Sequence, residues 1–320
     1  MNLHGIHHVT AVSRHIGQNA YFYTHVLGLR LVKKSVNQDD VSAYHLFYAD
    51  KIGSPGTDMT FFDFAYAASD KRGTDSITTT AFRVNGRDAL DYWNGRLREY
   101  GVDHEGITQF AGYDVIRFDD PEGQRLMLVD DKGADYEGEI WDQTDVPVEH
   151  ALRGFYAVML SLPRAPEIDP ILSGVLNMSL TRTTTTPEGN ELLIYSMGEG
   201  GPGLEVWVIS EPDAPRARLG AGGVHHVAYR VANSSEQSYW RQRVGGVGLP
   251  VSQQIDRFYF KSIYFRISNG ILFEIATDGP GFDADEELES LGETLALPPF
   301  LEPRRAEIEA NLKPIVMEAA

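Results

Sequence analysis

The chain has 320 residues, 42% of them apolar, which is enough for a buried core and for more than one domain. Its 46 acidic and 28 basic residues give a net charge of −18, which argues against a nucleic acid or an anionic membrane surface as a partner. It contains no cysteine, so disulfides and thiolate metal sites are excluded, and any metal must be bound by histidine, carboxylate or backbone oxygen.

The first half of the chain, residues 1–130, contains two copies of one pattern, at about 3–66 and 77–131. Each copy begins with a strand, continues with an amphipathic helix and ends with three strands. In the first copy, the apolar spacing predicts a helix at 16–28, and Gly28 ends it. The second predicted helix is 86–101, and the predicted strands are 6–13, 29–36, 43–50, 59–65, 78–84, 106–112, 113–120 and 124–130.

Residues 131–150 form a linker, after which the pattern returns twice in residues 151–277. The third copy covers about 152–210, the fourth about 222–277, and an acidic tail follows at 278–320. Four such βαβββ modules predict an α+β protein, with two cup-shaped, mostly antiparallel sheet pairs and the helices outside. The predicted helices here are 169–176 and 234–246, and the predicted strands are 152–162, 178–186, 190–198, 203–210, 223–231, 251–258, 260–268 and 271–277.

Adjacent histidines occur at the same point of modules one and four and not in the other two modules. They are His7 and His8 near the N-terminus, and His225 and His226 in module four. Glu274 lies among apolar residues in the last strand of module four, where a solvated charge is not expected. Two imidazoles and a carboxylate are typical ligands of a divalent first-row metal. The residues alone indicate a metal site at His8, His226 and Glu274; the alternative is two strand histidines with local hydrogen bonds and a surface carboxylate.

With these motifs and the tail sequence LPPFLEPRRAEIE at 297–309, the chain resembles the vicinal oxygen chelate superfamily along its whole length. That superfamily includes glyoxalase I, bleomycin-resistance proteins and extradiol dioxygenases. The resemblance is closest to ring-cleaving dioxygenases that act on hydroquinones. It implies Fe(II) bound by His8, His226 and Glu274, with Mn(II) or another divalent metal as the alternative, and insertion of O2 into the ring of a hydroquinone-like phenol.

The resemblance also has a consequence for which modules lie together. Catechol-cleaving members take all three ligands from modules three and four, but Phe155 and Tyr156 of module three cannot serve as these ligands. If His8 and the two module-four ligands share one metal, module one must lie beside module four. Modules two and three would then form a second cup without a metal, and the two His-His motifs would be distant in sequence because together they complete one site.

Five further residues match residues of the hydroquinone-type enzymes: His7, Thr10, His225, Arg257 and Tyr264. Tyr264 can donate a hydrogen bond to a phenolate or to reduced oxygen, and Arg257 can stabilise negative charge on a substrate oxygen. His7 and His225 should point away from the ligand face of a regular strand, so they reach the site only if the strands twist or bulge. For these two histidines, a packing role and a role in acid–base catalysis are both possible interpretations.

The expected partners are a small aromatic substrate and O2, in a cytoplasmic homo-oligomer such as a dimer, without nucleic acid or membrane. The N-terminus lacks a signal-peptide pattern, and no apolar run has the length of a membrane helix. Two other functions stay open. A glyoxalase-like isomerase or lyase would need a second carboxylate ligand, for which Asp58 and Asp63 are candidates. A resistance protein that sequesters a small molecule would usually lack the triad.

Overall fold

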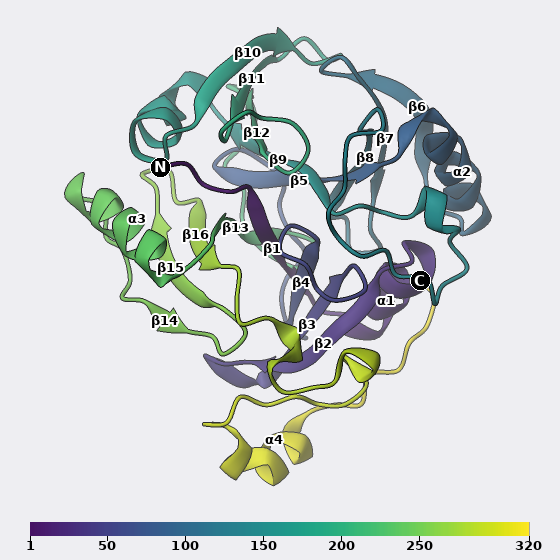
Figure 1. Ribbon diagram of the computed structural model, residues 1–320. Coiled ribbons are helices and arrows are strands. Elements are labelled where there is room, and N and C mark those ends of the chain that lie inside the picture. The colour runs from purple at the N-terminus through teal and green to yellow at the C-terminus, as the bar shows by residue number, and fades with distance from the viewer. Residues whose placement is uncertain (320) are drawn as a thin grey trace.

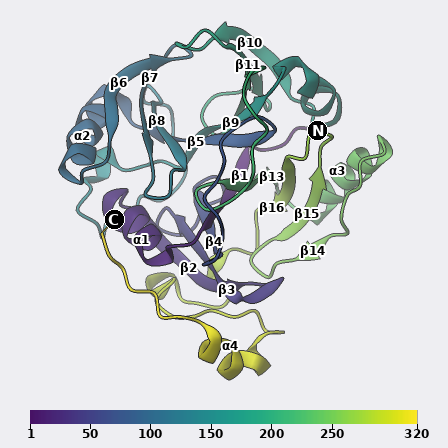
Figure 2. The same cartoon turned by 180° about the vertical axis from the view of Figure 1, so that it is seen from behind.

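The strands form two curled sheets of eight strands each in the computed structural model, which describes residues 1–319 (Figures 1 and 2). The first sheet contains all the strands of modules one and four. Its strands, in spatial order, are β14 (Ile255–Asp256), β15 (Lys261–Arg266), β16 (Leu272–Thr277), β13 (Val224–Val231), β1 (Ile6–Ser13), β4 (Asp58–Asp63), β3 (Asp40–Ala49) and β2 (Arg30–Asn37).

The second sheet contains the strands of modules two and three in the same arrangement. Its spatial order is β10 (Ser179–Thr185), β11 (Glu191–Ser196), β12 (Glu205–Ser210), β9 (Phe155–Leu162), β5 (Ser76–Val84), β8 (Arg125–Asp130), β7 (Tyr113–Asp119) and β6 (His104–Phe110). The predicted α+β architecture of two cup-shaped sheets with helices outside is confirmed. The two halves of the sequence are not the two halves of the fold.

Both sheets follow one plan of strand pairing. β1 and β13 pair antiparallel at the centre of the first sheet, and β5 and β9 do so in the second. The last strand of each module lies parallel to its first strand, as β4 does beside β1 and β16 beside β13. An approximate two-fold relation therefore exchanges β1 with β13 and β4 with β16, which places equivalent residues of modules one and four around a common centre.

The helices pack on the outer side of the sheets, at the periphery of both views (Figures 1 and 2). In α3, the side chain of Asn233 accepts hydrogen bonds from the first-turn amides, and Trp240 and Val244 are buried on its inner face. The predicted helix at 16–28 is an α-helix only over its first half and then takes π-helical geometry. The helices are α1 (Ile16–Tyr21), the π-helical segments Phe22–Val26 and Pro170–Val175, α2 (Gly86–Glu99), α3 (Ser234–Gly246), α4 (Arg305–Asn311), and the 3-10 turns Val148–His150, Ala165–Ile168, Phe282–Ala284, Leu288–Ser290 and Glu302–Arg304.

The strand predicted at 251–258 is wrong for most of its length, because it is paired only at an isolated bridge from Val251 to Phe265 and in the two-residue β14 (Ile255–Asp256). The backbone leaves the sheet at Phe258, whose φ of 75° lies in the left-handed region that strands do not use. The chain then crosses over the open face of the first sheet. This loop carries Arg257 and Phe260, which a regular strand would have placed along the sheet edge instead.

The C-terminal tail covers one side of the first sheet, where Figure 1 shows it in yellow beside β2 and β3. Lys33 of β2 is fully buried, and its ammonium group bonds Asp285, Glu286 and the carbonyl oxygen of Phe282 in the tail. An apolar cluster inside the cup joins the tail to both modules, and its members are Val32, Phe47, Ala49, Ala228, Tyr259, Phe260, Ala276, Phe282 and Leu291. Within residues 1–319, no helix is both long and apolar enough to span a membrane.

Candidate metal centre

His8, His226 and Glu274 meet at the centre of the first sheet, although 218 residues separate the two histidines. They lie on three adjacent strands, β1, β13 and β16, with side chains on the concave face. His8 Nε2 lies 3.3 Å from His226 Nε2, and Glu274 Oε2 lies 3.2 Å from the first nitrogen and 2.9 Å from the second. The three side chains are almost completely buried, so these atoms converge in a site with little water.

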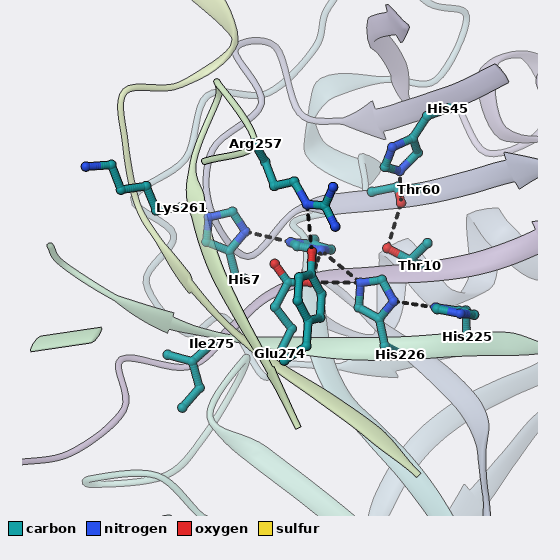
Figure 3. A network of polar contacts seen from close by, with 12 residues as sticks. His7, Thr10, His45, Thr60, His225, His226, Arg257, Lys261, Glu274 and Ile275 are labelled. Atoms are coloured by element: carbon teal, nitrogen blue, oxygen red, sulfur yellow. Dashed lines mark hydrogen bonds and ion pairs between the residues drawn. The ribbon is translucent and has the colours of Figure 1, made fainter. Parts of the chain in front are cut away.

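Two β-bulges place the remaining histidines of the His-His motifs. The pairing of β1 with β13 skips one residue at His7 and one at His225, so neither side chain follows the alternation of a regular strand. His7 Nδ1 lies 2.9 Å from His8 Nδ1, and His225 Nδ1 lies 2.7 Å from His226 Nδ1 (Figure 3). His8 and His226 are thus each contacted, on the nitrogen that faces away from the triad, by the preceding histidine in the sequence. An acid–base role for His7 and His225 stays a prediction.

The hydrogen bonds of His7 determine which nitrogen of His8 carries a proton. His7 Nε2 lies 3.1 Å from the carbonyl oxygen of Thr277, which can only accept, so this nitrogen is the donor. Burial and the neighbouring His8 lower the pKa of His7 to about 3, so its ring is neutral and Nδ1 has no proton. His8 must therefore donate from Nδ1, and its Nε2 presents a lone pair to the centre of the triad.

Glu274 adds a negative charge at the centre of the triad. Burial alone would raise its pKa, but a positive charge on His8, which forms when that ring is protonated, and the contacts with His226 and His8 hold the pKa well below the ordinary value. With His8 in its neutral form, the carboxylate needs another cation at the same place. Neither carboxylate oxygen has a well-oriented hydrogen bond within residues 1–319, even though the imidazole nitrogens are close. Lone pairs facing one another across about 3 Å repel, and a cation between them removes that repulsion. The residues present fit a divalent metal with nitrogen and oxygen ligands.

A narrow cavity opens above the triad, and both polar and aromatic side chains line it. Phe260 covers the two histidines, with its ring centroid 5.1 Å from those of His7 and His8. Thr10, Arg257 and Tyr264 also line the cavity, whereas His7 and His225 do not. A larger cavity beside the second sheet contains Met127 and Phe110, and no group of metal-type ligands lies there within the described residues.

Tyr264 and Arg257 form one wall of the cavity above Glu274. Tyr264 pairs with Glu274 across β15 and β16, and its ring packs edge-on against His226. Arg257 Nε donates to the Tyr264 hydroxyl at 3.3 Å, and its other nitrogens contact both carboxylate oxygens of Asp39 at 2.9 and 3.4 Å. Burial, and then the Glu274 carboxylate, raise the pKa of Tyr264, so its hydroxyl keeps the proton and can donate it.

The chain is similar to several known proteins, both in sequence and in structure. Residues 5–128 match the model of the glyoxalase/bleomycin resistance protein/dioxygenase superfamily. The Bacillus subtilis (strain 168) protein named "Putative ring-cleaving dioxygenase MhqA" is 46% identical over 98% of this chain and 100% of its own length. The chain belongs to the glyoxalase/bleomycin resistance/dioxygenase superfamily. The resemblance seen in the sequence is therefore confirmed.

Two further relatives agree with this membership. The chlorohydroquinone/hydroquinone 1,2-dioxygenase of Sphingobium indicum is 30% identical over 98% of this chain and 97% of its own length. The crystal structure of a "putative dioxygenase" from Bacillus subtilis superimposes with a TM-score of 0.90 at 34% identity, over 99% of both chains. Both comparisons cover all four modules and the tail of this superfamily member.

Module one offers no second carboxylate to the metal centre of this superfamily member. The two-fold relation that exchanges His8 with His226 puts Thr60, the partner of Thr10, at the position of Glu274. A glyoxalase-like site with a carboxylate from each module would need an acid at Thr60. The site instead has the neutral hydroxyl of Thr60 there, bonded to Thr10 and His45.

The two acids considered for that role lie elsewhere. Asp58 is buried opposite His8, and neither of its carboxylate oxygens has a hydrogen-bond partner within the described residues. Burial raises its pKa to about 8, although His8 opposes this, so Asp58 is mostly uncharged at pH 7 and is a poor anionic ligand. Asp63 lies at the end of β4, and neither acid belongs to the triad cluster.

The sequence did not single out His45, Thr60 and Asp39, yet all three belong to the site. His45 Nε2 lies 2.9 Å from Thr60 Oγ1, and Thr60 Oγ1 donates to Thr10 Oγ1 at 2.8 Å (Figure 3). This hydrogen-bonded row crosses β3, β4 and β1 on the concave face. The available signal was alternation, since His45 and Phe47 are two residues apart in one predicted strand and share a face.

Proposed function

We propose that the chain is a metal-dependent ring-cleaving dioxygenase that inserts O2 into a hydroquinone-like aromatic substrate. The reaction is of the extradiol type, in which the ring opens beside a hydroxyl-bearing carbon. His8, His226 and Glu274 hold the metal, which is Fe(II), with Mn(II) as the alternative that the same ligands accept. Relatives named as ring-cleaving dioxygenases over the full length of the chain support the reaction class.

One observation supports the metal more than any other: the lone pairs of two buried imidazoles and a buried carboxylate point at one place. Three protein ligands leave coordination positions free for other molecules, and module one has the neutral Thr60 in place of a fourth charged ligand. When bound, the metal lowers the pKa of a phenol hydroxyl and brings substrate and oxygen together.

The protein groups around the cavity then orient the substrate and supply hydrogen bonds and positive charge to its oxygen atoms. Tyr264 holds its proton within the cavity and donates a hydrogen bond to oxygen atoms that gain negative charge during the reaction. Burial lowers the pKa of Arg257, but Tyr264 and Asp39 raise it by more, so Arg257 keeps a positive charge beside that hydroxyl. The aromatic walls exclude water, which strengthens both interactions. Thr10, His7 and His225 complete the surroundings of the ligands.

The ligand set can be tested with Glu274→Gln, which keeps the shape of the side chain but removes the charge. We expect this variant to lose most of its iron, at least about 10-fold in affinity, and nearly all oxygen uptake with hydroquinone. Iron per chain is measured by mass spectrometry after anaerobic reconstitution, and oxygen uptake with an electrode. The same experiment with Mn(II) compares the two metals.

Glu205→Gln is the matched control, because Glu205 is a buried glutamate on β12 of the second sheet. It should keep both iron and activity. A Glu274→Gln protein with one iron per chain and undiminished oxygen uptake would show that the triad is not the metal site.

A further inference from the structure

His45 stands in the cavity in a fixed orientation. It lies on β3, and its ring is clamped between Phe47 and Phe62, with centroid distances of 3.9 and 4.4 Å. The pairing register explains this clamp, because Phe47 shares the strand face with His45 and Phe62 faces it across β4. A histidine held this way cannot turn its ring freely, so each nitrogen has a defined direction.

The hydrogen bonds of His45 leave one nitrogen free as an acceptor. Thr60 Oγ1 uses its only proton towards Thr10, so it must accept from His45 Nε2, and that nitrogen carries the ring proton. Within residues 1–319, His45 Nδ1 has no hydrogen-bond partner, and it is not sealed from solvent among the buried unpartnered atoms. Burial, with His8, His226 and Arg257 nearby, lowers the pKa of His45 well below its ordinary value, so the ring is neutral.

The polar groups of the cavity thus differ in kind. Arg257 and Tyr264 on one wall are donors, and they suit an oxygen that becomes negatively charged. His45 on the module-one side is an acceptor, and it suits a hydroxyl that keeps its proton. The two phenylalanines beside His45 line the same cavity and give it apolar walls that suit an aromatic ring. A ligand that satisfies both walls is an aromatic ring with two hydroxyl groups.

We propose that His45 Nδ1 accepts a hydrogen bond from a second hydroxyl of the aromatic substrate, and that His45 thereby selects diphenols over phenols with a single hydroxyl. This inference rests on the proposed function, because it assigns the second polar group of the substrate of that same site. A site that offers a buried acceptor disfavours a ligand that leaves the acceptor unpaired.

The test measures the affinity for hydroquinone and for phenol separately, using the iron-loaded full chain in the absence of oxygen, by titration calorimetry. The ratio of the two dissociation constants is the readout, because it requires no turnover. We expect the wild type to bind hydroquinone about 5- to 10-fold more tightly than phenol. Phenol affinity serves as the check that the cavity of each variant is intact.

Three variants separate the roles of the two ring nitrogens. His45→Asn keeps an acceptor near the position of Nδ1 and should retain the preference for hydroquinone. His45→Gln keeps a donor to Thr60 but not that acceptor, and His45→Phe keeps only the ring; both should reduce the ratio to nearly one. The inference is overturned if the wild type shows no preference, if His45→Phe retains it, or if His45→Gln retains it while His45→Asn does not.

Oxygen uptake by the wild type in air is a separate measurement. Absence of uptake with every diphenol would refute the dioxygenase, while the anaerobic ratio would still decide the role of His45. Normal uptake together with an unchanged ratio in His45→Phe would refute the role of His45 alone.

Discussion

At the scale of single residues, the hydroxyl of Tyr264 is a hydrogen-bond donor that lines the cavity beside the ligand candidates. It pairs with Glu274 across the strands and receives a hydrogen bond from Arg257. A donor that acts mainly on charge formed in the transition state lowers kcat more than it raises KM when it is removed. The substitution that isolates this effect is Tyr264→Phe, since it keeps the ring and its contact with His226.

For Tyr264→Phe, we expect iron content to stay unchanged and kcat to fall by about 10²-fold. Steady-state oxygen uptake with hydroquinone measures both constants. Tyr229→Phe is the control, because Tyr229 is a buried tyrosine on β13 whose hydroxyl has no partner within the described residues, so its loss should leave kcat unaltered. An unaffected kcat in Tyr264→Phe would return this residue to a packing role.

Residue types in the sequence predicted the triad, but not the geometry behind it. The recurrence of the His-His pair and the buried position of Glu274 were sufficient for the ligands. Regular alternation would have turned His7 and His225 away, and only the two bulges of the β1–β13 pairing bring them behind the ligands. A bulge depends on how two strands 218 residues apart align, which no local pattern contains.

At the scale of elements, the turn between β2 and β3 bridges the mouth of the cavity. Asp39 of this turn contacts the Arg257 guanidinium, and Gln38 donates to the Arg257 carbonyl oxygen, so module one holds the loop of module four from both sides. The Asp39 side chain is 74% exposed, and ion pairs of that kind contribute little to stability, about 0–1 kcal/mol. The Asp39–Arg257 ion pair should therefore affect the orientation of Arg257 rather than the stability of the fold.

We expect Asp39→Asn to lower kcat/KM for hydroquinone by about 3- to 10-fold, because an orienting contact to a charged group is lost. The melting temperature should change by no more than a few degrees. Asp40→Asn, at the next position, is the control, since Asp40 bonds Ser42 and not Arg257. Equal effects of the two variants on kcat/KM would contradict a specific role for Asp39.

Element prediction failed where tertiary contacts replaced local preference. The segment 251–258 alternates enough to suggest a strand, yet Gln254 bonds Gln237 and Ser234 of α3 and Phe258 turns into the left-handed region. Most strands, and α2 among the helices, were predictable because their apolar spacing is strong. The loop that closes the site was not, because its path is set by the tail and the aromatic cluster inside the cup.

At the scale of the whole molecule, a buried ion pair joins the tail to the first sheet. Lys33 is completely buried, and Asp285 and Glu286 are only 20% and 10% exposed. Replacing Lys33 by methionine leaves two carboxylates without their cation. We expect Lys33→Met to lower the free energy of unfolding by roughly 2–4 kcal/mol, somewhat less than for a pair sealed from water, because the carboxylates keep some solvent contact.

Urea denaturation measures this change, and limited proteolysis shows whether the tail is released first. Lys51→Met is the control, because Lys51 forms an exposed pair with Glu139 at 3.5 Å and should lose less than about 1 kcal/mol. If Lys33→Met and Lys51→Met unfold at the same urea concentration, the tail is not held by this pair.

The pairing of β1 with β13 also determines when the first sheet can be completed during synthesis. The ribosome adds about 5–20 residues per second, so the 218 residues between His8 and His226 take roughly 10–40 s to appear. During that time β1 has β4 on one side, while the edge meant for β13 has no strand to pair with. Modules two and three follow one another in the chain, and the paired residues Ala81 and Ala157 of their central strands are only 76 positions apart, so they can close their own sheet first. The nascent N-terminal module must therefore wait with an open strand edge, the kind of surface that chaperones shield and that misassembles when it is left unprotected.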